Sequence, residues 1–161
     1  VLEVALKQAC EQFVESRITE GERLKEDLFD KLDGMIRDVD AIEDRYPQIM
    51  TEYREKLTLK VEELLGDAQM EEGRIAAEVI LFADKICTDE ETVRLRSHIE
   101  SMREELLSGG SVGRKLDFLA QEMNREANTI LSKANDLETS NRAINLKTEI
   151  EKVREQIQNI E

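Results

Sequence analysis

Apolar residues recur every three or four positions along most of this 161-residue sequence, with charged residues between them. In the first part of the chain the series contains Leu24, Leu28, Leu32, Met35, Val39 and Ile42. This spacing gathers apolar side chains on one face of an α-helix. It predicts a long amphipathic helix from Val1 to about Tyr46, which Gly21 and Gly34 weaken without ending it.

Pro47 marks the expected start of a second helix, because proline suits the first turn of a helix and disrupts a helix interior. The apolar series then continues to Leu64 and stops at the Gly-Asp pair 66–67. We expect these two helices to pack against each other as a long antiparallel hairpin over residues 1–67.

The remaining residues, 68–161, form a second predicted region that is also helical. A third helix covers about 70–86. Thr88 followed by Glu91 has the spacing of a capping box, in which two side chains satisfy the first backbone amides of a helix. This pair predicts that a fourth helix starts there.

The Ser-Gly-Gly-Ser stretch 108–111 predicts a flexible joint, followed by a helix over 113–136 and a last helix to the C-terminus. The last helix carries the apolar series Ile150, Val153, Ile157 and Ile160. Only 4% of residues are aromatic and 37% are charged. The sequence therefore predicts an all-α protein of long amphipathic helices in a coiled-coil-like hairpin or bundle, with a plain coiled coil as the alternative.

The cysteine and hydropathy patterns indicate a soluble cytoplasmic protein. Cys10 and Cys87 lack the spacing of a metal site or a disulfide framework, which favours reduced thiols. No apolar run approaches the roughly 20 residues of a membrane span, and no secretory signal opens the sequence. We expect no membrane partner.

The formal net charge of −14 disfavours a nucleic-acid partner, because it repels a polyanion at long range. Residues 112–135 differ from the rest of the chain. Their four basic residues outnumber their three acidic ones and are Arg114, Lys115, Arg125 and Lys133. The acidity therefore lies mainly elsewhere.

The predicted 113–136 helix carries unusual polar residues beside its apolar stripe. At about 100° per residue, that stripe contains Leu116, Met123, Ala127, Ile130 and Ala134. One flanking strip contains Lys115, Glu122, Glu126 and Lys133. The other flanking strip contains Asp117, Gln121, Asn124 and Asn128.

Glu122 and Glu126 lie one turn apart, where like charges repel mildly. Oxygen ligands at this spacing can converge on one Mg²⁺ or Mn²⁺. Alternatively, each glutamate pairs with Lys133, with Arg125 or with a neighbouring helix. The amides of the other strip suit RNA bases and 2′-hydroxyls, and equally suit contacts between helices. Spacing alone leaves these alternatives open.

His98 is the only histidine and lies beside the apolar stripe of its helix. It can bind a metal or transfer a proton, and it can equally be structural. The sequence contains no nucleophile elbow, phosphate loop, paired zinc ligands or dinucleotide glycine motif. The carboxylate, histidine and basic side chains that remain suit metal-assisted phosphodiester hydrolysis.

Five segments together resemble the C-terminal region of the YicC/YloC family of bacterial proteins. They are "VGRKLDFLAQEMNREANTILSKAND", "LKTEIEKVREQIQNIE", "RLRSHIESM", "EVILFADK" and, more loosely, "ESRITEGERL". The resemblance implies an endoribonuclease that requires a divalent metal, assembles as a hexamer and closes around RNA. It also implies a further N-terminal domain, so this sequence resembles part of a longer protein.

Two positions differ from the pattern of that family. Leu131 stands where the family usually has glycine, which stiffens the helix. Cys87 stands where the family usually has an acidic residue, so a cation site there would have to use other carboxylates. The nearby candidates are Asp84, Asp89, Glu90 and Glu91, which otherwise cap and charge the next helix.

With the resemblance in view, we expect the 113–136 helix to bind or cleave RNA. The residues expected to contact phosphates are Arg114, Lys115, Arg125 and Lys133, and those expected to contact bases or sugars are Asn124 and Asn128. The residues expected to bind metal or transfer protons are His98, Asp117, Glu122 and Glu126. The alternative is a non-catalytic helical module that oligomerises and holds RNA for a degradation factor.

Overall fold

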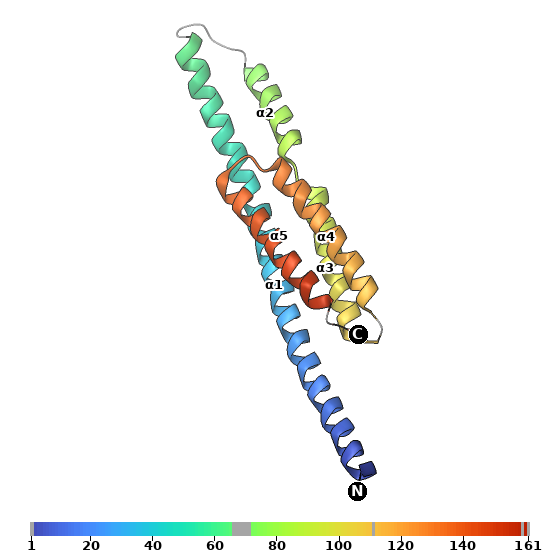
Figure 1. The fold of residues 1–161 in the computed structure, drawn as a ribbon. Coiled ribbons are helices and arrows are strands. Elements are labelled where there is room, and N and C mark those ends of the chain that lie inside the picture. The colour runs from blue at the N-terminus through green and yellow to red at the C-terminus, as the bar shows by residue number, and fades with distance from the viewer. Residues whose placement is uncertain (1, 66–71, 111, 159, 161) are drawn as a thin grey trace.

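A computed structural model of the chain describes residues 2–65, 72–110, 112–158 and 160. These residues form five helices, which are α1 (Leu2–Leu65), α2 (Glu72–Ile86), α3 (Asp89–Ser108), α4 (Gly113–Lys133) and α5 (Leu137–Ile157). No strand occurs in the described ranges. The predicted all-α fold of long helices in a bundle is confirmed (Figure 1).

Helix α1 continues without interruption through Pro47, so the predicted helix end at Tyr46 and the hairpin within residues 1–67 are wrong. A proline inside a helix costs about 3 kcal/mol or more, because it removes a backbone hydrogen bond and crowds the preceding turn. Ile42 and Ile49 are buried on either side of the proline. Burial of these side chains opposes the local cost and keeps the helix continuous.

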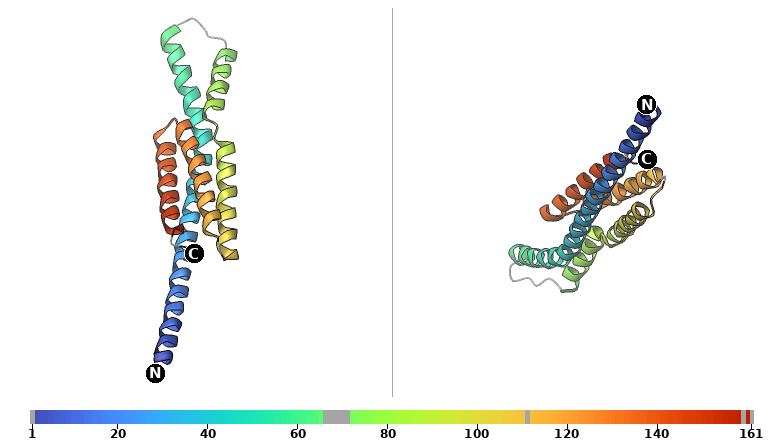
Figure 2. Two further views of the ribbon diagram at one scale, coloured as in Figure 1. Left: turned by 45° about the vertical axis from the view of Figure 1, so that its right-hand side comes forward. Right: turned by 90° about the horizontal axis from the view of Figure 1, so that it is seen from below.

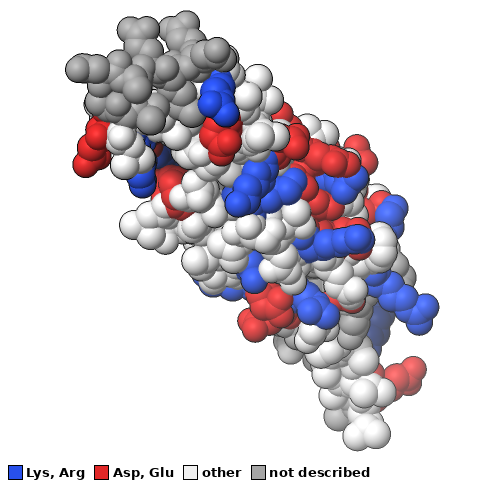
Figure 3. Space-filling view, turned by 90° about the horizontal axis from the view of Figure 1, so that it is seen from above, with Lys and Arg blue, Asp and Glu red and all other residues white. Residues whose placement is uncertain are grey.

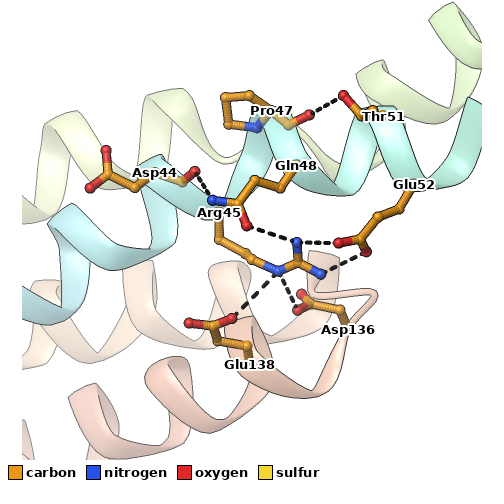
Figure 4. A network of polar contacts seen from close by, with 8 residues as sticks. All are labelled: Asp44, Arg45, Pro47, Gln48, Thr51, Glu52, Asp136 and Glu138. Carbon is orange, nitrogen blue, oxygen red and sulfur yellow. Dashed lines mark hydrogen bonds and ion pairs between the residues drawn. The ribbon is translucent and has the colours of Figure 1, made fainter.

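The side chain of Arg45 also makes hydrogen bonds that stabilise α1 around the proline (Figure 4). Its two Nη atoms donate to the carboxylate of Glu52 at 2.7 and 2.8 Å, and its Nε donates to Asp136 at 3.1 Å. Glu52 lies beyond Pro47 on α1, whereas Asp136 immediately precedes α5. A single side chain therefore ties both sides of the proline to the last helix.

The C-terminal part of α1 packs antiparallel to α2 instead. Tyr53 and Phe82 stack with ring centroids 3.7 Å apart and planes 11° apart. The Tyr46 hydroxyl donates to the carbonyl of Ala83 at 3.1 Å. The two helices form an arm that extends beyond the bundle, at the end away from the N-terminus (Figure 2).

The core lies among the middle of α1, α3, α4 and α5, where α3 and α5 each pack against both α1 and α4. The stripe predicted for the first helix is buried there at Leu28, Leu32, Met35, Val39 and Ile42. Residues 2–23 of α1 are all exposed and continue past the bundle to the N-terminus (Figure 1). No helix in the described part of the chain is long and apolar enough to cross a membrane.

The start of α3 was predicted correctly, but not the contacts that produce it. The helix begins after Thr88, whose side chain makes no capping hydrogen bond. Glu91 is paired with Lys133 of α4. The predicted capping box is therefore wrong, since Glu91 serves a contact between helices.

The predicted joint before α4 contains two glycines in the left-handed backbone region. Gly109 has φ 68° and Gly110 has φ 84°, which suits a residue without a side chain. Ser111 of this joint, the predicted break at 66–67 and the predicted helix start at 70 lie outside the described residues. The division of the chain at residue 67 stays a prediction.

Candidate nucleic-acid interface

Helix α4 lies between α3 and α5 and faces the core with its apolar stripe. Leu116, Met123, Ala127 and Ile130 are fully buried. One edge of α4 meets α3, where Glu126 and Lys133 find partners, and the other edge meets α5, where Asp117 accepts from Arg154 at 3.1 Å. The first predicted polar strip therefore lies along the boundary with α3, whereas only Asp117 of the second strip is paired across the boundary with α5.

Glu126 is buried at the boundary with α3, with only 5% of the residue exposed. Its Oε1 lies 3.9 Å from Nη1 of Arg94. Glu122, one turn earlier, is half-buried and lies 4.0 Å from Arg125. Each glutamate thus has a basic neighbour, as one of the two alternatives from the sequence predicted.

The predicted metal ligands do not form a cluster within a single chain. His98 is half-buried on α3. The described residues contain no group of three or more histidine, cysteine, aspartate or glutamate side chains placed to hold a metal ion. Metal binding by Glu122, Glu126 and His98 stays a prediction, and it would require ligands beyond this set.

The acidic residues around Cys87 differ in their partners and exposure. Glu90 pairs with Arg94, whereas Glu91 accepts from Lys133 at 2.8 Å. Asp84 and Asp89 are exposed. The amine of Lys133 also donates to the backbone carbonyl of Cys87 at 3.0 Å. This region therefore joins the start of α3 to the end of α4.

Two predicted RNA contacts of α4 are already occupied by protein partners. Lys115 is hydrogen-bonded to Glu105 of α3, and Lys133 is held between Cys87 and Glu91. Asn124 is half-buried. Direct RNA contact by Lys115, Asn124 and Lys133 stays a prediction.

The remaining predicted contacts lie on one exposed line, which we call the outward face of α4. Its members are exposed, point away from the core and are Arg114, Phe118, Gln121, Arg125, Asn128 and Ser132. Two arginines and no acidic residue give this line two positive charges. Arg114 makes no ion pair with any described residue, and Arg125 has only its 4.0 Å contact with Glu122.

Phe118 was not among the predicted site residues, because most of those residues lie in the two polar strips that flank the core stripe. Its spacing from the two arginines was nevertheless enough to place it on their side of the helix. Phe118 lies four residues after Arg114 and seven before Arg125, and both intervals return to the same side of a helix.

A second concentration of polar side chains surrounds a hollow of about 640 Å³ between α1 and the start of α5. Hydrogen bonds from Arg45 lower the pKa of Glu52. Burial acts to raise the pKa of Asp136, but the nearby Thr139 and the hydrogen bond from Arg45 leave it below its ordinary value. Arg45 pairs with Glu52, Asp136 and Glu138, and Arg142 pairs with Asp38, so the cluster joins α1 to α5.

Basic and acidic side chains are interspersed over the end of the molecule that carries the arm (Figure 3). Basic side chains do not form a separate patch on this face. A nucleic acid would therefore have to be bound by local groups of residues, because the net charge of −14 provides no general attraction.

Comparison with known proteins finds relatives along the whole chain. The sequence model of the family described as "Endoribonuclease YicC-like, C-terminal" matches residues 42–161. A protein of Clostridioides difficile named "Probable endoribonuclease YicC" is 43% identical over 162 residues, which cover 100% of this chain and 55% of that protein. A protein of Haemophilus influenzae with the same name is 38% identical over 149 residues, covering 92% and 51%. The chain spans about half the length of these curated relatives.

Proposed function

This chain belongs to the YicC-like endoribonuclease family, and we propose that it is the RNA-binding C-terminal part of a metal-dependent endoribonuclease. The observation that carries the proposal is the outward face of α4. In an acidic chain, this helix presents two arginines in line with exposed amides and without an acidic residue.

The outward face has the chemistry that RNA binding requires. The guanidinium groups of Arg114 and Arg125 suit phosphate oxygens, because they are planar, permanently charged donors. The amides of Gln121 and Asn128 can donate to and accept from base edges and 2′-hydroxyls. Gln121 already donates to Asp117 at 2.7 Å, which leaves its carbonyl oxygen as an acceptor.

Metal dependence is proposed from the family resemblance, and the residues of one described chain do not fit a complete cation site. Glu122 and Glu126 offer two carboxylates, but Arg94 occupies the space next to Glu126. A third ligand would have to come from another subunit or from the rest of a longer protein. We derive no catalytic step through the metal.

Self-association as a homo-oligomer, with a hexamer suggested by the resemblance, is part of the same proposal. The exposed stretch 2–23 of α1 carries Leu2, Leu6, Val14 and Ile18, which are each at least half exposed. Apolar side chains presented along a projecting helix are typical of an interaction surface. We place the protein in the cytoplasm, where unpaired thiols such as Cys10 persist.

A second candidate function is a non-catalytic module that oligomerises and holds RNA. It is favoured by the lack of a three-ligand group among the described residues and by the length of the curated relatives. In this version, catalysis belongs to another part of the longer protein or to a degradation partner.

Cleavage of an end-labelled RNA separates the two candidates. The 161-residue chain and a full-length protein would each be incubated with the RNA in Mg²⁺, in Mn²⁺ and in EDTA. We expect the full-length protein to cleave internally with either metal and to stop in EDTA. Binding without cleavage by both proteins would support the holding module, and absence of RNA binding would overturn both candidates.

A further inference from the structure

Phe118 is an exposed aromatic residue within a polar helix face. It is 58% exposed, while Leu116 and Leu119 on either side are buried in the core. Phe118 is thus left outside a core that its two apolar neighbours help to fill. A single exposed apolar residue is common in proteins, so its neighbours on the surface have to indicate whether it has a role.

The neighbours of Phe118 are ordered along the helix. At 100° per residue, the six residues of the outward face lie within about 40° of one line. Arg114 comes one turn before Phe118, Gln121 one turn after it and Arg125 two turns after it. An aromatic ring therefore lies between two phosphate-binding groups on the same exposed line.

We propose that Phe118 stacks on an unpaired base and makes the outward face of α4 selective for single-stranded RNA over duplex RNA. This inference rests on the proposed function and names its substrate class. Arg114 and Arg125 hold phosphates on either side of the stacked base, and Asn128 contacts a neighbouring sugar or base.

Duplex RNA does not offer the same contact. Bases in an A-form helix are stacked on each other, and the major groove is too narrow and deep for side chains to read. The ring of Phe118 projects from a straight helix, which presents no wedge or loop to open a duplex. Arginine contacts to phosphates remain available in both forms, so only the stacking contribution distinguishes them.

The charge around Phe118 favours RNA over a second copy of this chain that presents the same face. The outward face contains two arginines and no acid, and another subunit that presented this same face would oppose like charges. A polyanion with exposed aromatic faces complements both the charge and the ring.

The first test measures the affinities of the 161-residue chain for an unstructured RNA and for a duplex of the same length. Phe118→Ala should weaken binding of the single strand by about 5- to 150-fold, the usual range for one base–aromatic stack. Duplex affinity should stay within about twofold. Leu107→Ala is the matched control, because Leu107 is a similarly exposed apolar residue (65%) that belongs to α3 and not to the outward face of α4. It should change neither affinity.

A second test reads the stack directly. The chain contains no tryptophan, so Phe118→Trp introduces a single tryptophan at the proposed contact, and its emission can be excited separately from that of the two tyrosines. Single-stranded RNA should quench its emission, and an abasic strand with the same number of phosphates should quench it far less. Circular dichroism of both variants should match that of the wild type, since the side chain is exposed.

Four outcomes would overturn the inference. Unchanged single-strand affinity in Phe118→Ala, or equal quenching by the abasic strand, would remove the stacking role. If RNA affinity still depended on Arg114 and Arg125, the proposed function would stand without it. Emission from Phe118→Trp that is blue-shifted and concentration-dependent before RNA is added would identify a subunit contact. Absence of RNA binding by the wild type would end both proposals.

Discussion

Lys133 provides the clearest distinction between an RNA contact and a structural contact on α4. Its amine donates to the Oε1 of Glu91 at 2.8 Å and to the carbonyl of Cys87 at 3.0 Å. The Glu91 side chain is only 9% exposed, and its Oε2 has no hydrogen-bond partner among the described residues. The buried carboxylate therefore depends on this lysine.

We predict that Lys133→Met destabilises the fold by about 2–4 kcal/mol. Removing one partner of a fully buried ion pair costs roughly 3–5 kcal/mol, because the other charge stays buried without compensation. The Lys133 side chain is 32% exposed, so water reaches the gap and lowers that cost. For a chain of this size the melting temperature should fall by roughly 5–15 °C.

Thermal and urea unfolding at fixed protein concentration would measure this effect. Adding Glu91→Gln to Lys133→Met should restore part of the stability, because the second change removes the buried charge. Lys7→Met is the matched control. Lys7 lies 4.0 Å from Glu11 with both side chains largely exposed, so its loss should cost under about 0.5 kcal/mol.

RNA affinity completes the test of Lys133. If the lysine is structural, the affinity of Lys133→Met at a temperature where it is folded should stay within about twofold of the wild type. Unchanged stability together with a clear loss of RNA affinity would refute this reasoning and establish a phosphate contact.

Three further predictions follow from other parts of the molecule. The double variant Glu122→Gln/Glu126→Gln should change the free energy of unfolding by no more than about 1 kcal/mol. If the two glutamates contribute to cleavage, the RNA cleavage rate of the full-length protein should fall by orders of magnitude. An undiminished rate would make both residues structural. The lowered pKa values of Glu52 and Asp136 mean that their contribution to stability is complete above their ordinary pKa values, near pH 4, and is lost as pH falls through the lowered ones. Arg45→Met should therefore unfold less steeply with acid below about pH 4 in a pH series of melting curves, and an identical slope would contradict this. Light scattering at tens of micromolar should show self-association of the chain, and a strictly monomeric mass would count against the proposed assembly.

The periodicity of the sequence predicted the helices that form the bundle. Most residues of the predicted stripes of α1, α4 and α5 are buried as their spacing indicated, because a 3.6-residue repeat fixes which side chains share a helix face. The same repeat was unable to predict the continuity of α1 through Pro47. That continuity involves Arg45 and Asp136, which lie 91 positions apart in the chain.

Long-range pairing also limited the prediction of the site. The strip that contains Lys115 and Lys133 was placed correctly beside the core stripe, but its partners on α3 were not visible in the local pattern. Whether a flanking residue faces a neighbouring helix or solvent depends on the position of that helix. Phe118 illustrates the opposite case, because its position two residues after Leu116 already places it on the side of the helix away from the core stripe, where it is exposed.

The central claim is that RNA binds along the outward face of α4, and its most direct test is the salt dependence of affinity for an unstructured RNA. The 161-residue chain would be compared with Arg114→Glu/Arg125→Glu and with Arg37→Glu/Arg54→Glu, in which two exposed arginines of α1 are reversed. Each arginine-to-glutamate substitution lowers the net charge by two, so both double variants have the same net charge, four units below the −14 of the wild type.

We expect the α4 variant alone to lose most of its affinity, and the slope of log affinity against log salt to fall by roughly 1 to 2 as two phosphate contacts disappear. The α1 variant should keep the wild-type slope and lose only the small amount due to its greater net charge. Equal losses in the two variants, or an α4 variant that binds RNA as the wild type does, would contradict the account.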